Sequence, residues 1–268
     1  MDIRAVFGAS APLVGMVHLP PLPGSPRYDG DREALAERAR ADAAALADGG
    51  VDAVMVENFG DAPFHAEDVP KHVVATMTDL TRTVREVVDL PVGVNVLRND
   101  AEAALSVATA VGAAFVRVNV HTGARVTDQG VIEGRADETM RLRERLGADV
   151  AVLADLDVKH SAPLADASYE SEAMADTIER GLADGVVVSG SATGAAAELS
   201  AVEAAAAKRD ALGVDTPVFV GSGVTPETVA DYLSVADGAI VGTALKGGDR
   251  PADPVDRERV EALVAAAR

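Results

Sequence analysis

The sequence contains no cysteine and no tryptophan, and only 3% of its residues are aromatic. The absence of cysteine excludes disulfides, thiolate metal sites and a cysteine nucleophile, and it agrees with a reducing compartment. No apolar run reaches the roughly 18 residues that a membrane helix needs, and Gly8, Ser10, Pro12 and Gly15 interrupt the N-terminal apolar stretch. We therefore expect a soluble, cytoplasmic protein without membrane insertion.

Lysine is also scarce, with only Lys71, Lys159, Lys208 and Lys246 in the chain. Acidic residues outnumber basic residues by 43 to 24, and the formal net charge is −19. A surface this negative disfavours nucleic acid and anionic membranes as partners. Acid-rich, lysine-poor surfaces are typical of proteins from salt-loving organisms, because salt screens the self-repulsion. Most of the acidic residues therefore reflect adaptation to salt, and only those inside the fold are candidates for a functional role.

The chain does contain a repeated pattern in which short apolar runs alternate with helical segments. Eight such repeats in 268 residues predict an α/β fold, a (β/α)8 TIM barrel that forms a single domain over residues 1–268. The expected strands are Leu13–His18, Ala53–Glu57, Val92–Leu97, Phe115–Val120, Val150–Asp157, Val186–Ser189, Val218–Gly221 and Ala239–Val241. The expected helices are Asp31–Ala47, Lys71–Val88, Asp100–Val111, Ala136–Leu146, Ser171–Leu182, Ala195–Leu212, Pro226–Leu233 and Pro254–Ala267, the last capped by Asp253.

Glycine-containing turns follow the last two expected strands, within the stretch Pro217–Lys246. Turns at the carboxyl ends of barrel strands commonly present backbone N–H groups to phosphate. One such turn alone would favour a merely tight connection, whereas two in succession favour a phosphate site. The expected phosphate-binding residues are Gly221, Ser222, Gly223, Gly242 and Thr243, with Ser189 and Ser191 as further donors.

Strand parity predicts a polar interior, because alternate side chains of a barrel strand face inward. The inward polar residues of the second to fifth strands are Glu57, Asn95, Arg117, Asn119, Asp155, Asp157 and Lys159. Buried charges need partners, so we expect Arg117 to pair with Glu57 or Asp155. Because barrel active sites lie at this rim, we interpret the set as catalytic, with His18 as a further acid or base. The alternative is that these inward polar residues pair with one another and fill the barrel interior without a catalytic role.

Asp157 and Lys159, last along the fifth strand, are the expected acid or base and its electrostatic partner. Such a pair can also bind a hydroxylated substrate without moving protons. Lys159 can form a Schiff base if burial or Arg117 lowers its pKa, although nearby acids oppose that shift. No motif demands a cofactor. A divalent metal held by Glu57, Asp155, Asp157 and a histidine stays open, without a compact motif such as HExxH.

Several segments resemble the BtpA family, which includes the SgcQ-like proteins. They are MVHLPPLPGSPRY (16–28), VDAVMVENFGDAPF (51–64), VGVNVLRND (92–100), FVRVNVHTGARVTDQGVIEG (115–134), ADLDVKHSAPL (154–164), VVSGSATG (187–194) and FVGSGVT (219–225). The resemblance implies a ribulose-phosphate-binding barrel. It also implies two different roles, because the founder is linked to accumulation of photosystem I reaction-centre proteins whereas SgcQ-like genes lie beside sugar-uptake genes. Some members are labelled phosphoribosylanthranilate isomerases, a chemistry that uses a cysteine base, which this chain lacks.

We therefore predict an enzyme that acts on a phosphorylated sugar or similar small phosphate ester by isomerisation, epimerisation or aldol-type cleavage. One alternative is a non-catalytic assembly or stability factor, which would need an exposed apolar patch; Phe59, Pro63 and Phe64 are the visible material for it. A sugar-phosphate sensor with the same pocket is another. Alanine-rich helix faces leave a homo-oligomer open.

Overall fold

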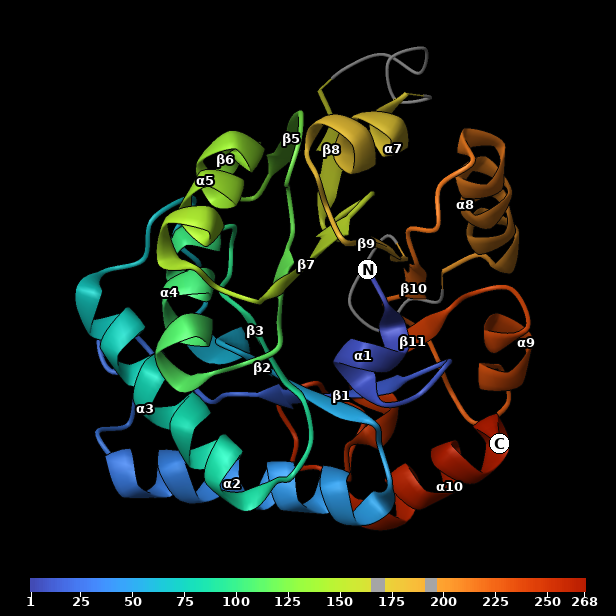
Figure 1. Cartoon of the computed structure of the whole chain (residues 1–268). Helices are drawn as coiled ribbons and strands as arrows, with labels where there is room; N and C mark the ends of the chain where they lie inside the picture. The colour runs from blue at the N-terminus through green and yellow to red at the C-terminus, as the bar shows by residue number, and fades with distance from the viewer. Residues whose placement is uncertain (165–171, 191–196) are drawn as a thin grey trace.

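The computed structural model describes residues 1–164, 172–190 and 197–268. Eight parallel strands close into a barrel, and helices surround it (Figure 1). The strands are β1 (Leu13–His18), β2 (Ala53–Glu57), β3 (Val92–Asn95), β4 (Phe115–Val118), β7 (Ala151–Asp155), β9 (Gly185–Val188), β10 (Val218–Val220) and β11 (Gly238–Val241). Each strand pairs with the next barrel strand along the chain, and β11 returns to β1. The predicted single (β/α)8 barrel is confirmed.

The third, fourth and fifth barrel strands end two residues earlier than expected. The reason is their pairing: Asn95 of β3 is the last residue matched both to Glu57 of β2 and to Arg117 of β4. Likewise, Asp155 is the last residue of β7 paired to β9. Beyond these positions no further strand pairs form among the described residues, and the chain turns into the loops of the rim.

The outer helices follow the predicted order. They are α2 (Arg32–Gly49), α3 (Lys71–Val87), α4 (Ala101–Val111), α5 (Ala136–Leu146), α7 (Ala173–Ala175) with the π-helical turn Asp176–Arg180, α8 (Leu199–Leu212), α9 (Val229–Leu233) and α10 (Arg257–Ala267). Aspartate side chains cap the first turns of several helices, such as Asp31 for α2 and Asp100 for α4. The cap of α10 is Asp256 and not Asp253. Asp253 instead holds the preceding turn by accepting hydrogen bonds from Arg250.

The larger core lies between the barrel and these helices. In α3, the buried residues Val73, Met77, Leu80 and Val84 recur at helical spacing and form one apolar stripe. The outward side chains of the strands, such as Val94 of β3, pack in the same cluster. Strand parity therefore places the valines against the helices, as predicted, and leaves the opposite faces of the strands for the barrel interior.

A short helix that the sequence pattern did not reveal closes one end of the barrel. It is α1 (Ile3–Phe7), capped by Asp2. Phe7 packs at ring-centroid distances of 5.0 Å from Phe115 and 5.7 Å from Phe219, the latter two in barrel strands. Together with inward apolar side chains of the other strands they form a separate inner core at the amino ends of the strands.

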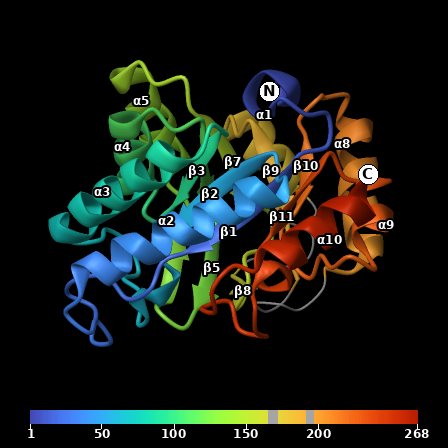
Figure 2. The ribbon, with the colours of Figure 1, turned by 90° about the horizontal axis from the view of Figure 1, so that it is seen from below.

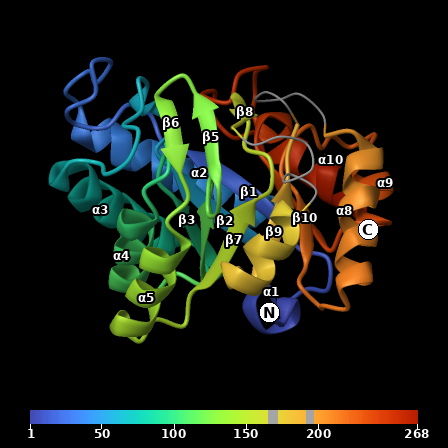
Figure 3. The same cartoon turned by 90° about the horizontal axis from the view of Figure 1, so that it is seen from above.

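A small antiparallel sheet, also unpredicted, lies at the opposite end. It consists of β5 (Ala124–Thr127), β6 (Gly130–Glu133) and β8 (Ser161–Pro163), with β5 in the middle. β5 and β6 lie between β4 and α5, and β8 lies between β7 and α7. Figures 2 and 3 show this sheet and α1 at opposite ends of the barrel. Among the described residues, no helix has the length and apolar character required to cross a bilayer.

Candidate functional site

A cavity of about 920 Å³ opens at the carboxyl ends of the barrel strands. Among the described residues, its charged lining is mainly basic, in contrast to the chain as a whole. The basic side chains are Arg27, Arg38, Arg98, Arg117, Lys159 and Arg259, and the acidic ones are Glu57, Asp128 and Asp249. Acids outnumber bases by 43 to 24 in the sequence, so the cavity reverses the overall ratio. Arg117 and Arg38 are ion-paired with the buried Asp155 and Asp42 outside the lining. The cations left to attract an anion are Arg27, Arg98, Lys159 and Arg259.

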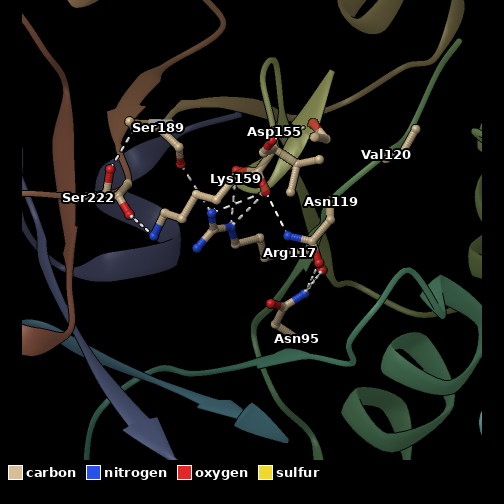
Figure 4. Close-up of polar contacts among 12 residues, drawn as sticks. Asn95, Arg117, Asn119, Val120, Asp155, Lys159, Ser189 and Ser222 are labelled. Carbon is tan, nitrogen blue, oxygen red and sulfur yellow. Dashed lines mark hydrogen bonds and ion pairs between the residues drawn. The ribbon is translucent and has the colours of Figure 1, made fainter. Parts of the chain in front are cut away.

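Arg117 and Asp155 form the centre of a buried network below this cavity (Figure 4). Both Nε and Nη2 of Arg117 donate to the Asp155 carboxylate, with the shortest contact 2.8 Å from Nη2 to Oδ1. Asn119 donates to the other carboxylate oxygen at 2.7 Å. The side chains of Arg117 and Asp155 are 5% and 0% exposed. The pair anticipated from parity is therefore formed, with Asp155 and not Glu57 as the partner of Arg117.

Asn95 and Ser189 extend the network to neighbouring strands. Asn95 Nδ2 donates to the Arg117 carbonyl at 2.9 Å and to Asn119 Oδ1 at 3.2 Å. Arg117 Nη2 also donates to Ser189 Oγ at 3.3 Å, so Ser189, which was expected to bind phosphate, belongs to this network and is not among the described residues that line the cavity. Arg117 and Asn119 reach the cavity wall, whereas Asn95 and Asp155 support them from behind.

Lys159 lies on the cavity wall and is not paired with a carboxylate among the described residues. Its Nζ donates to the carbonyl of Gly221 at 3.0 Å, as Figure 4 shows beside Ser222. Burial and the nearby Arg117 guanidinium lower the pKa of Lys159 to about 8. Lys159 is therefore a cation that gives up its proton much more readily than an exposed lysine.

His18 and Glu57 lie next to each other on the opposite wall of the cavity, with His18 Nε2 3.6 Å from Glu57 Oε1. Because the Pro251 carbonyl can only accept, His18 Nδ1 carries the proton that bonds to it at 2.9 Å. Burial and the Lys246 ammonium lower the pKa of His18 well below its usual range. Nε2 is therefore an unprotonated acceptor. Burial also raises the pKa of Glu57, toward the protonated acid.

The two glycine turns border the same cavity, to which Gly221, Ser222, Gly223, Gly242 and Thr243 all contribute. Gly223 has a φ of 69°, which a side chain would strain. A Cβ on Gly242 would lie 2.9 Å from His18 Cε1, so this glycine leaves room for the imidazole. Ser222 Oγ accepts from the Gly190 amide at 2.6 Å and fixes the first turn. Ser191 lies outside the described residues.

The expected pairing of Asp157 with Lys159 is wrong. The strand ends at Asp155, so parity no longer orients Asp157, whose side chain is 67% exposed and 2.9 Å from Arg125 Nη1. Asp157 therefore does not join Glu57 and Asp155 in a metal site. No group of three potential ligands converges on one point in the described part of the chain.

Several cavity residues were not predicted from the sequence, and Arg98 and Phe59 are two of them. Arg98 follows β3 and lines the wall although it is only 6% exposed. Phe59 stacks on His18 with a ring-centroid distance of 4.8 Å. Phe59 and Phe64 thus line the cavity and do not form the exposed patch that the assembly-factor alternative required. Arg98 comes shortly after β3 and Phe59 shortly after β2, and these positions beyond strand ends were the available signals.

Comparison with known proteins assigns the family. A model described as BtpA family matches residues 9–268. The chain belongs to the BtpA family. It is 47% identical over 268 residues to the photosystem I biogenesis protein BtpA of Synechocystis sp., covering 99% of this chain and 91% of that one. An uncharacterised Pyrococcus furiosus relative is 46% identical, with 94% and 93% covered.

Solved structures confirm the barrel of this BtpA-family chain. A Mycobacterium tuberculosis tryptophan synthase structure aligns with a TM-score of 0.61, 20% identity and coverage of 100% of this chain and 98% of that one. The N-(5'-phosphoribosyl)anthranilate isomerase of Pyrococcus furiosus aligns with a TM-score of 0.56, 16% identity and coverage of 95% and 98%. At these identities the similarity establishes the fold alone.

Proposed function

We propose that this BtpA-family protein binds a phosphorylated sugar, or a similar small phosphate ester, and converts it by isomerisation, epimerisation or aldol-type cleavage. The observation that carries the proposal is the basic lining of the cavity in a chain of net charge −19. Cations that are clustered in one cavity repel one another, so such a lining is costly to maintain without an anionic ligand that uses it. An anion of small-molecule size is the ligand that a cavity of about 920 Å³ suits.

The phosphate is assigned to the turns at Gly221–Gly223 and Gly242–Thr243, beside the Lys159 ammonium. Backbone N–H groups and one cation complement its charge there. Anchoring the phosphate orients the rest of the molecule toward Arg117, Asn119, His18 and Glu57, so binding energy contributes to positioning.

Proton transfer is assigned to His18 and Glu57. Isomerisation next to a carbonyl needs one group that removes a proton from carbon and one that donates a proton to oxygen. The unprotonated Nε2 of His18 suits the first role, and the carboxyl of Glu57, whose pKa burial raises, suits the second. Phe59, stacked on His18, shields this pair from water.

A titration with ribulose, ribose and glucose monophosphates tests the proposal. Calorimetry gives the affinity, and phosphorus NMR of the incubated mixtures detects a product. We expect binding in the wild type and its loss in Thr243→Glu, which places a carboxylate at the second turn. Thr243→Gln introduces a side chain of nearly the same shape as glutamate but without its charge, and this variant is expected to keep binding. Equal affinities of the two variants would contradict the assigned phosphate position.

A second candidate is a non-catalytic assembly factor, which the printed name of the Synechocystis relative favours. Val126 and Val131 face each other across β5 and β6 and are 42% and 48% exposed, which gives a small apolar contact surface. Phosphate-ester binding without any product, together with loss of partner capture in Val126→Asp, would favour this candidate. A sugar-phosphate sensor would bind without turnover and would not depend on Val126.

A further inference from the structure

Arg98 is a buried cation without a counter-ion in the described part of the chain. Its side chain lines the cavity but is only 6% exposed. One amino group, Nη2, donates to the backbone carbonyl of Lys159, whereas the buried Nε has no hydrogen-bond partner. No described carboxylate forms an ion pair with it. Arg117, by contrast, forms an ion pair with Asp155.

Burial of Arg98 without a counter-ion destabilises the folded protein unless a bound ligand supplies the missing partner. A buried charge and an unsatisfied buried donor each destabilise a folded protein. Burial lowers the pKa of Arg98, and Asp128 is the leading acid that opposes the shift. A guanidinium that already has one donor bound offers its remaining donors to a planar or tetrahedral anion.

The position of Arg98 is held by the backbone around it. Asn58, which is buried, accepts from the Leu97 amide at 2.7 Å and donates to the Leu97 carbonyl at 3.3 Å. The Arg98 amide donates to the His65 carbonyl at 3.1 Å. This loop is therefore fixed from both sides, which is what a preformed binding position requires.

Lys159 relates Arg98 to the proposed phosphate position. The backbone carbonyl of Lys159 accepts from Arg98, and its Nζ reaches the Gly221 carbonyl at the first glycine turn. Arg98 and the turn therefore contact the two ends of one lysine residue, and both line the same cavity. A ligand anchored at the turn extends toward Arg98 with its other end.

We propose that Arg98 is a second anion-binding position and that the substrate is a small phosphate ester with a further anionic group at its far end. The class comprises sugar bisphosphates and phosphorylated sugar acids, which share that feature. This inference rests on the proposed function, because the first anion is the phosphate at the glycine turns.

Calorimetric titrations of the wild type with ribulose monophosphate, ribulose bisphosphate and phosphogluconate test the inference. Because one charged hydrogen-bonded contact is added, we expect at least one of the two compounds with a second anionic group to bind about ten- to a hundredfold more tightly than the monophosphate. A preference for the bisphosphate or for phosphogluconate identifies the second group as phosphate or carboxylate. Equal affinities for all three would overturn the inference and leave the proposed function intact; no binding at all would overturn both.

Variants at Arg98 assign the preference to this residue. Arg98→Gln is expected to abolish the preference while monophosphate affinity stays within about twofold, since the amide can still donate to the Lys159 carbonyl. Arg98→Lys keeps the charge and is expected to retain part of the preference. Arg27→Gln removes an exposed cation of the same cavity and serves as the matched control, in which the preference should remain. If a folded Arg98→Gln protein lost affinity equally for the monophosphate and for the ligands with two anionic groups, Arg98 would have a structural role and the assignment would be wrong.

Discussion

The two ends of the barrel interior are built from opposite materials. At the amino ends of the strands, Phe7, Phe115 and Phe219 pack together with inward aliphatic side chains and form a core without charged members. At the carboxyl ends, Arg117, Asp155 and Asn119 occupy the same interior and lie beneath an open cavity. The same eight strands supply both ends, so the difference comes from a change of residue type along each strand.

The apolar end stabilises the fold, whereas the polar end reduces its stability in order to hold charged groups for a ligand. Buried aromatic and aliphatic surface contributes favourably without needing partners. Buried charges contribute little net stability even when they are paired, and they cost free energy when they are not. Substitutions at the two ends should therefore separate stability from ligand binding.

The largest effect is expected for Asp155→Ala. It leaves the buried Arg117 guanidinium and the Asn119 amide without their acceptor, and breaking such a pair costs about 3–5 kcal/mol. Urea unfolding measures the change. The double variant Arg117→Met/Asp155→Leu makes the carboxyl end apolar like the amino end and should recover most of the stability while losing anion binding. If the double variant were as unstable as Asp155→Ala, the contrast between the ends would be wrong.

Phe7→Ala is expected to destabilise the protein by about 3–4 kcal/mol, because it removes the ring that contacts Phe115 and Phe219. Affinity for a sugar phosphate should not change, since the ring lies at the closed end. Unfolding experiments and calorimetry on the same preparation measure both quantities. A Phe7→Leu variant, with a cost of about 1 kcal/mol, is the graded control. A parallel loss of affinity would show that the two ends are coupled.

Lys159→Met is expected to stabilise the protein by about 1–2 kcal/mol at pH 7 and to weaken phosphate binding. In the folded state the pKa of Lys159 is lowered from 10.5 to about 8, so the unfolded chain holds this proton more strongly. The cost is complete below pH 8 and disappears as the pH rises toward 10.5. The lost hydrogen bond to Gly221 offsets part of the gain.

The pH dependence supplies the control for this variant. The advantage of Lys159→Met over the wild type should shrink between pH 8 and pH 10.5. Wild-type affinity for a phosphate ester should fall as the pH rises through about 8, when Lys159 loses its charge, and the variant should lack this fall. A constant stability difference over the whole range would mean that Lys159 titrates normally.

The smallest effect is expected for Gly223→Ala, about 1 kcal/mol of stability, because its φ of 69° is unfavourable for a side chain. Gly213→Ala is the matched control: Gly213 has a φ of 70°, ends α8 and has no atom near an added Cβ. Both variants should lose similar stability in thermal melts, but only Gly223→Ala should weaken phosphate binding. Equal affinities would remove the first turn from the site.

Periodicity was sufficient to predict the barrel and to narrow the partner of Arg117 to two carboxylates. Alternation along β4 and β7 placed Arg117 and Asp155 inward, and a buried arginine needs a carboxylate, so the expected partner was Glu57 or Asp155; the structure has Asp155. The same alternation failed for Asp157 because it applies only while a strand is paired, and β7 ends at Asp155. The family assignment, made from motifs, is also confirmed.

Features that depend on tertiary contacts could not be predicted. The short helix α1 is stable only because Phe7 finds Phe115 and Phe219 inside the barrel, which five residues of sequence do not reveal. Arg98 is buried because Asn58 and His65 hold its loop, and no local pattern encodes that. The polarity of the carboxyl end was readable, whereas the arrangement of its loops was not.

The most direct test of the account is a crystal structure of the protein with ribulose monophosphate. We predict electron density for the phosphate between Gly221–Gly223 and Gly242–Thr243, within hydrogen-bond distance of Lys159 Nζ, with the sugar directed toward Arg117 and His18. A phosphate bound outside the cavity, or an empty cavity at saturating ligand in a crystal form that leaves it open, would contradict the proposal that the polar end of this barrel is a phosphate-ester site.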